Sequence, residues 1–183
     1  MKLPFFNFKD PKPVDPFPKI LILGHGRHGK DAMADVLFDA YGIEGISSSL
    51  FAAKKFLYDL LKGEMGYKNF VDCYEDRHNH RARWYEEIKK YNTPDRSRLA
   101  REMMEEHHIY VGLRDDQEIQ ACIDEGVFDL IVGVDRPDFP RESMSSFPAQ
   151  VYMKQQCDFI VYNSGSLVEY EQKIIRIFDR ILL

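Results

Sequence analysis

The chain has 183 residues, of which 44% are hydrophobic, and its formal net charge is −5. This length and hydrophobic content predict one globular domain with a substantial core rather than a disordered chain, and the negative charge argues against broad electrostatic binding of nucleic acid. The three cysteines are widely spaced and form no C-x-x-C pair, which argues against a disulfide framework or a zinc site and is consistent with a reducing cytoplasm.

The first segment, residues 1–18, is rich in proline, with Pro11, Pro13, Pro16 and Pro18 close together. Because proline fixes φ and removes a backbone donor, we expect an extended arm on the domain surface. The segment lacks the sustained hydrophobic stretch of a signal peptide, and no part of the chain approaches the roughly 20 apolar residues that a membrane span needs. The folded domain is therefore expected over residues 19–183, with no membrane partner.

A glycine-rich loop follows the first apolar strand. Residues 24–31 read GHGRHGKD and fit the pattern G-x-x-x-x-G-K, with an apolar strand at residues 19–23 before it and a helical pattern at residues 32–38 after it. Glycines allow successive backbone N–H groups to point inward, the helix N-terminus adds positive potential, and Lys30 supplies a mobile cation. This context predicts a nest for a polyphosphate. The residues expected at the bound nucleotide are Gly24, Gly26, Gly29, Lys30, Asp31 and Ala32.

Two other features of this loop lead to different expectations. His25 and His28 lie inside the loop and could contact phosphate, but they occupy variable loop positions, and we favour the interpretation that they have no role. Asp31 stands where serine or threonine usually ligates magnesium. Its carboxylate could hold magnesium directly or through water, or it could simply be a favourable anion in a first helical turn. Asp135, at the end of a later strand, could be a second magnesium carboxylate or could hold Arg136 in place.

Helix and strand patterns alternate along the chain. After the loop, the patterns predict helices to about residue 41 and at residues 50–61, 67–93 (a polar helix), 96–107 and 115–125, and a last helix from a Ser166 cap to residue 182. Strands are predicted at residues 43–48, 109–113, 128–134 and 158–162. This alternation predicts an α/β fold with a parallel, doubly wound sheet. Ligands of such sheets lie beyond the carboxyl ends of the strands, so Arg114, Arg136 and Asn163, each directly after a strand, are expected near Lys30.

Two segments carry further expectations. The irregular stretch between the last two strands, within about residues 136–150, is a natural mobile lid. In the polar helix, Trp84 and Tyr85 could stack on a base or anchor the core, and we favour the core.

Four blocks of the sequence resemble the bacteriophage deoxynucleoside monophosphate kinases of the P-loop kinase group. They are the loop ending in Gly-Lys-Asp at residues 24–31, the segment LFAAKK at 50–55, the strand and arginine within 109–118, and the Asn-x-Gly-Ser-Leu turn within 158–167. Residues 134–137 match the position of the family's lid-side arginine. The sequence departs from the family at Ala53, where a proline is usual, and at Gly112, where some members carry an aspartate; residues 67–93 match least.

The resemblance implies a three-layer P-loop kinase fold with a helical acceptor-binding insert, about residues 67–107, and a short lid. It implies transfer of the γ-phosphate of ATP, with Mg²⁺, to a deoxynucleoside monophosphate, in the cytoplasm of an infected host cell. It implies that Lys30 binds the donor phosphates and that the acceptor phosphate is bound by Arg77, Arg81, Arg98 and Arg114. Arg136 and Arg141 of the lid would contact the transferring group. Asn163 would contact the nucleotide, and Asp31 or Asp135 would bind magnesium.

Two other functions stay open. The chain could phosphorylate a hydroxymethylated base within phage DNA, in which case Glu75 or Asp76 would be needed as a base for the hydroxyl acceptor. It could also be an ATP-binding module without turnover. The sequence does not decide the preferred acceptor base or whether the chain forms a homodimer.

Overall fold

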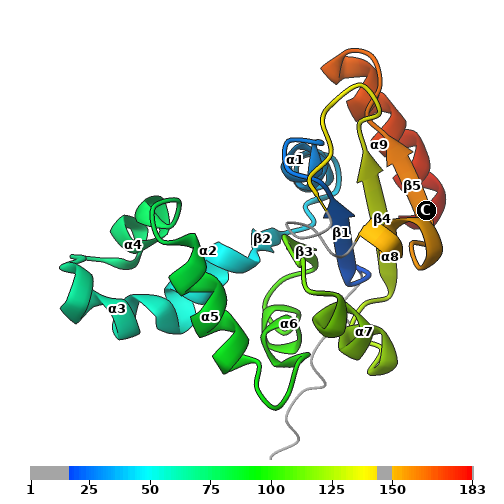
Figure 1. The fold of residues 1–183 in the computed structure, drawn as a ribbon. Helices are drawn as coiled ribbons and strands as arrows, with labels where there is room; N and C mark the ends of the chain where they lie inside the picture. Colours follow the sequence, from blue (N-terminus) through cyan, green and yellow to red (C-terminus); the bar gives the residue numbers. More distant parts are fainter. Residues whose placement is uncertain (1–16, 144–149, 183) are drawn as a thin grey trace, which may run out of the picture.

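A computed structural model describes residues 17–143 and 150–182 (Figure 1). The expected arm, up to residue 16, and residues 144–149 of the expected lid lie outside the described residues. The centre of the fold is a five-stranded parallel sheet in the order β2-β3-β1-β4-β5. Its strands are β1 (Ile20–Gly24), β2 (Gly45–Ser47), β3 (Ile109–Val111), β4 (Leu130–Asp135) and β5 (Phe159–Tyr162).

Helices α1 (Lys30–Tyr41) and α9 (Leu167–Leu182) pack on one face of the sheet. Their buried side chains, including Leu37 and Phe178, meet Ile20 and Ile22 of β1. Alternate residues of a strand point to opposite faces, so the side chains of the remaining β1 residues point to the other face of the sheet.

On the other face, Leu21 and Leu23 of β1 join a second core with three more helices. These helices are α6 (Arg98–Met103), α7 (Asp116–Asp124) and α8 (Gln150–Gln155). Because β1 is buried on both faces, its sequence is a continuous apolar run, as is typical of a central parallel strand. The predicted α/β class, with a parallel sheet between two helical layers, is confirmed.

A group of helices projects beyond the β2 edge of the sheet (Figure 1). It consists of α2 (Ser48–Ala52), the π-helical turn η1 (Ala53–Leu57), α3 (Tyr58–Met65), α4 (Phe70–Asp76) and α5 (Arg81–Tyr91). These helices have an apolar cluster of their own, which includes Leu57, Leu61, Cys73 and Trp84. None of the described helices is both long and apolar enough to cross a membrane.

Two predicted helices differ from the observed ones. The helix expected over residues 67–93 is broken between Asp76 and Arg81, where the backbone N–H of Asn79 donates to the carbonyl of Asp76 and its side-chain amide donates to the Asp76 carboxylate. Such local side-chain hydrogen bonds compete with the helical ladder. The helix expected at 96–107 is shorter, because the chain turns after Met103 toward β3.

The beginning of the last helix agrees with the sequence. The hydroxyl oxygen of Ser166 accepts a hydrogen bond from the backbone N–H of Glu169, and the N–H of Ser166 donates to the Glu169 carboxylate. This reciprocal pair is a capping box, which satisfies two N–H groups that have no partner within the helix.

Candidate functional site

The glycine-rich loop lies between the carboxyl end of β1 and the beginning of α1, at the middle of the sheet. Gly29 has a φ of 103°, and a Cβ there would lie 2.6 Å from the side-chain nitrogen of Asn163. A Cβ at Gly24 would lie 2.6 Å from the carbonyl oxygen of Val134. Both positions therefore require glycine, for conformation or for close approach, and the loop has the form that the sequence predicts.

Lys30 begins α1 and curls back over the loop. Its ammonium group donates a hydrogen bond of 2.7 Å to the carbonyl oxygen of His25. Burial, followed by the nearby charge of Arg114, lowers the pKa of Lys30 below its ordinary value. A partly desolvated cation beside a second cation is stabilised by an anion bound between them.

His25 and His28 are both buried, contrary to the expectation that they have no role. The Nδ1 atom of His28 accepts a hydrogen bond from the backbone N–H of Arg136 at 2.9 Å, and its Nε2 lies 3.3 Å from the carbonyl oxygen of Pro140. The Nδ1 atom of His25 accepts from the backbone N–H of Glu142 at 3.0 Å. The two histidines thus fasten the segment after β4 to the loop. Their partners are more than 100 residues away, so no local sequence signal indicates this role.

Glu142 is a second residue that the sequence does not single out. One of its carboxylate oxygens accepts from the backbone N–H of Gly26 at 2.7 Å, and the other accepts from the guanidinium of Arg114 at 2.8 Å. Burial alone would raise the pKa of Glu142, but the hydrogen bonds from Arg114 and Gly26 hold the pKa below its ordinary value. A carboxylate therefore lies against the loop N–H groups that would face a phosphate.

Asp135 is the acidic residue at the carboxyl end of β4. Its Oδ2 accepts from Arg141 at 2.6 Å, whereas its Oδ1 is buried without a hydrogen-bond partner, 3.4 Å from His28 Nδ1. Asp31 is exposed in the first turn of α1. Magnesium is commonly held by one or two carboxylates together with phosphate oxygens, and the unpartnered Oδ1 fits such a role. Within residues 17–143 and 150–182, no group of three metal-ligating side chains is present.

The other predicted loop-side residues have structural partners. The Asn163 amide donates to the carbonyl of His28 at 2.9 Å, so Asn163 supports the loop from behind. Ala32 is half-buried and packs on the α1–α9 core. Arg136 is exposed, with its guanidinium 5.2 Å from the centre of the Phe139 ring, and Arg141 binds Asp135.

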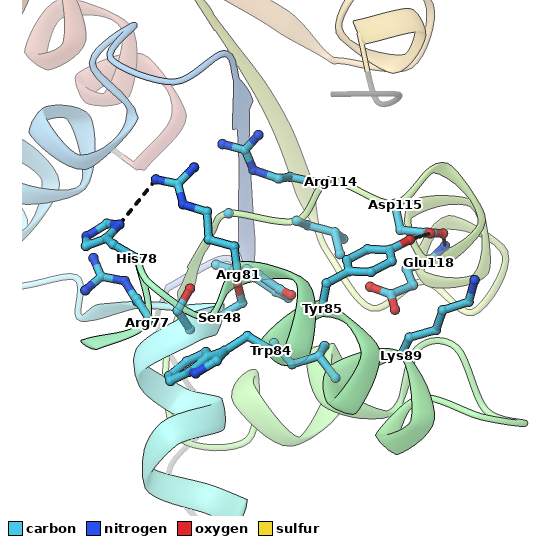
Figure 2. A pocket seen from close by; sticks show the side chains of 15 residues that line it. Ser48, Arg77, His78, Arg81, Trp84, Tyr85, Lys89, Arg114, Asp115 and Glu118 are labelled. Carbon is cyan, nitrogen blue, oxygen red and sulfur yellow. Dashed lines mark hydrogen bonds between the residues drawn. The ribbon is translucent and has the colours of Figure 1, made fainter. Parts of the chain in front are cut away.

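A cavity of about 400 Å³ adjoins the loop side of β3 and lies between the sheet and α5. It is lined by Ser48, Ser49, Arg77, His78, Arg81, Trp84, Tyr85, Ile88, Lys89, Tyr110, Gly112, Leu113, Arg114, Asp115 and Glu118. Three of the four arginines expected at the acceptor are therefore brought together. Figure 2 shows the guanidinium groups of Arg81 and Arg114 on the same side of this space, with Arg81 beside His78.

The walls of the cavity combine core and surface residues. Trp84 is only 4% exposed and belongs to the helical cluster, as expected, yet it also lines the cavity. Tyr85 is exposed, and its hydroxyl donates to the Asp115 carboxylate at 3.2 Å. Flat apolar walls beside a cationic end fit a ligand with a ring at one end and an anion at the other.

Arg98, expected at the acceptor, is outside this cavity. Its Nε donates to Glu102 at 3.1 Å, and its guanidinium stacks 4.0 Å from the centre of the Tyr91 ring. Arg77 lines the cavity but is partly engaged, because it donates to the Tyr74 carbonyl at 2.8 Å. We therefore omit Arg98 from the candidate site and retain the other three arginines.

Two solved kinase structures are similar to this chain. Dephospho-CoA kinase from Campylobacter jejuni has a TM-score of 0.45 and 12% identity, covering 91% of this chain and 98% of that chain. A gluconokinase from Sinorhizobium meliloti 1021 has a TM-score of 0.48 and 11% identity, covering 90% of this chain and 93% of that chain. Comparison with protein-family models and with curated proteins finds no match.

Proposed function

We propose that this protein is a kinase that transfers the γ-phosphate of ATP to a deoxynucleoside monophosphate. The observation that carries the proposal is the pairing of two sites: a phosphate-binding loop with Lys30, and a neighbouring cavity that combines Arg77, Arg81 and Arg114 with aromatic walls. Arg114 connects the two sites, because it lines the cavity and shares Glu142 with the loop.

The division of roles follows from this geometry. The loop N–H groups and Lys30 would hold the donor phosphates. Arg81 and Arg114, with Arg77 behind them, would hold the acceptor phosphate close to the donor. No general base is needed, because the acceptor phosphate is itself the nucleophile and catalysis depends on positioning and charge. Arg136 and Arg141, after β4, are proposed to approach the transferring group once the nucleotide displaces Glu142.

Magnesium fits this arrangement through Asp135. Its buried, unpartnered Oδ1 is a suitable ligand, and Asp31 is close enough in sequence to the loop to act through water. Asp135, with Asp31 through water, would hold the ion, and the ion would offset the negative charge of the donor phosphates. The residues of the chain would hold it only in part, so its binding should depend on the nucleotide.

A coupled assay tests the proposal. ATP and magnesium are supplied with each of the four common deoxynucleoside monophosphates and, separately, with duplex DNA that contains hydroxymethylated bases. Formation of a diphosphate supports the proposal. Phosphate transfer to DNA alone would contradict it and favour a kinase that phosphorylates a hydroxymethylated base within DNA. ATP binding without turnover of any acceptor would indicate a non-catalytic module.

The structure offers little support for a kinase that phosphorylates a hydroxymethylated base within DNA. That reaction would need Glu75 or Asp76 as a base, and neither residue lines the cavity. Asp76 accepts hydrogen bonds from Tyr67 and Asn79, and these bonds lower its pKa. A carboxylate held in this way is a weak base and is not directed at the cavity.

A further inference from the structure

A buried carboxylate lies in the cavity away from its arginines. Glu118 is 8% exposed and lines the cavity together with Tyr85 and Lys89. In Figure 2 its carboxyl group faces the space beside Tyr85, while the Arg81 guanidinium lies at the other side. The cavity therefore has the Arg81 guanidinium on one side and, on the other, the Glu118 and Asp115 carboxylates with the Lys89 ammonium near Glu118.

The position of this carboxylate is well determined. Glu118 lies in the first turn of α7, where its backbone N–H donates to the Asp115 side chain at 3.1 Å. Its Oε1 accepts a hydrogen bond of 2.9 Å from the Asn92 amide. The Asn92 carbonyl oxygen in turn accepts from the backbone N–H of Leu99, so the amide orientation is determined and its NH₂ group must face Glu118.

The second oxygen of Glu118 is available to a ligand. Within the part of the chain that the structure describes, the Asn92 amide donates to Oε1, and no hydrogen bond is made to Oε2. Burial, opposed by the Asn92 hydrogen bond, raises the pKa of Glu118 above its ordinary value, as expected for a carboxylate that lacks hydration. Such a group gains most from a ligand that brings N–H donors.

The nucleobases differ in what they present to a carboxylate. The Watson–Crick edge of guanine carries two adjacent donors, N1–H and the 2-amino group, which match the two oxygens of a carboxylate. Adenine and cytosine place a ring-nitrogen acceptor beside their amino donor, and thymine has one N–H between two carbonyls. These acceptors would face the carboxylate oxygens and be repelled, so the carboxylate both selects guanine and rejects the others.

We propose that Glu118, oriented by Asn92, reads the acceptor base and makes this cavity selective for a guanine nucleotide. This inference rests on the proposed function, since it assumes that a nucleoside monophosphate occupies the cavity with its phosphate at the arginines. The base would then lie along Trp84 and Tyr85, with its donor edge toward Glu118.

The test compares kcat/KM for the four deoxynucleoside monophosphates and for the deoxyinosine monophosphate, which lacks the 2-amino group. The wild-type protein should use dGMP at least 10-fold better than dAMP, dCMP or dTMP, and should lose about 10-fold when the 2-amino group is removed. The isosteric variant Glu118→Gln should lower kcat/KM for dGMP at least 10-fold and make dGMP and dIMP nearly equivalent. Asp116→Asn, which removes an exposed carboxylate from the same helical turn outside the cavity, should retain the wild-type preference.

The outcomes separate the two proposals. Turnover of several acceptors without a preference for dGMP, or a preference that survives in Glu118→Gln, would overturn the role of Glu118 and leave the kinase activity standing. Failure of all five acceptors would overturn both. If Glu118→Gln does not fold, as judged by thermal unfolding, the comparison of dGMP with dIMP in the wild-type protein still decides the question.

Discussion

At the scale of single residues, the site depends on a few charges held in low-dielectric surroundings. Lys30 is partly buried and donates to the His25 carbonyl, so it is positioned before any nucleotide binds. Arg114 lies at the junction of the loop and the cavity. These two cations should therefore have separable kinetic roles, with Lys30 serving the donor and Arg114 the acceptor.

Lys30→Ala should reduce kcat by at least about 100-fold, because it removes a cation that faces the charge developing on the transferred phosphate. The free energy of unfolding should change by no more than about 1 kcal/mol, since one hydrogen bond is lost. Steady-state kinetics and thermal unfolding measure the two effects. Lys62→Ala, which removes an exposed lysine that pairs with Asp59 and lies over the Tyr58 ring of its own helix, is the matched control. Near-normal activity of Lys30→Ala would mean that the loop does not bind the donor.

Arg114→Ala should raise the KM for the acceptor about 10- to 100-fold, which corresponds to the loss of a charged hydrogen bond of about 1.5–3 kcal/mol. The KM for ATP should change less than about 3-fold. Arg176→Ala on the remote helix α9 serves as the control. Equal effects on both KM values would contradict the assignment of Arg114 to the acceptor side.

At the scale of elements, caps and turns decide where each helix presents its side chains. Asp115 caps α7 and thereby directs Glu118 into the cavity, while the break between α4 and α5 brings His78 and Arg81 to its opposite side. On the face of the sheet that α1 and α9 cover, Tyr170 of α9 donates to the Gly29 carbonyl. The beginning of α9 therefore contributes to the shape of the loop as well as to stability.

Removal of the α9 cap tests this link. Ser166→Ala should lower the free energy of unfolding by about 1 kcal/mol, because the backbone N–H of Glu169 loses its side-chain partner. The neighbouring exposed Ser164→Ala should have no measurable effect. Chemical denaturation of both variants and the wild-type protein provides the comparison. If the two serine variants were equally stable, the capping box would not contribute.

At the scale of the whole molecule, contacts between distant segments join the loop, the segment after β4 and the cavity beside β3. Glu142 bonds to Gly26 and to Arg114 at once, and His25 holds its backbone. On the proposed function, an incoming ATP would displace this carboxylate and thereby change the surroundings of Arg114. We therefore expect donor binding to be coupled to the acceptor site.

Glu142→Gln should tighten ATP binding about 10-fold, because the neutral amide competes less well for the loop N–H groups and Arg114. Without nucleotide, the variant should be less stable than the wild-type protein by about 1 kcal/mol at neutral pH, a value reduced for the partial exposure of the side chain. Glu105→Gln, an exposed position, is the control. Calorimetric titration with ATP gives the affinity, and weaker binding by Glu142→Gln would show that Glu142 does not oppose the nucleotide.

The same pair of proteins has a defined pH dependence. The pKa of Glu142 is lowered in the folded state relative to its ordinary value of 4.5. Its contribution to stability is therefore fully present above that value and is lost as the pH falls through the lowered folded pKa. The stability difference between the wild-type protein and Glu142→Gln should shrink at acid pH, as measured by denaturant unfolding between about pH 3 and 7.

The sequence by itself determined the glycine-rich loop between strand and helix, the parallel α/β class and the Ser166 cap, because each depends on neighbours within a few residues or on a regular apolar period. It also indicated that Arg114, following a strand, would reach the site. Only the tertiary structure decided that Arg77 and Arg81 reach the cavity while Arg98 packs on Tyr91. The roles of His28, Glu142 and Glu118 likewise depend on partners far away in the chain or on the space that packing leaves. Such side chains come together only through the register of the paired strands and the crossover connections between them, and no local sequence pattern contains this information.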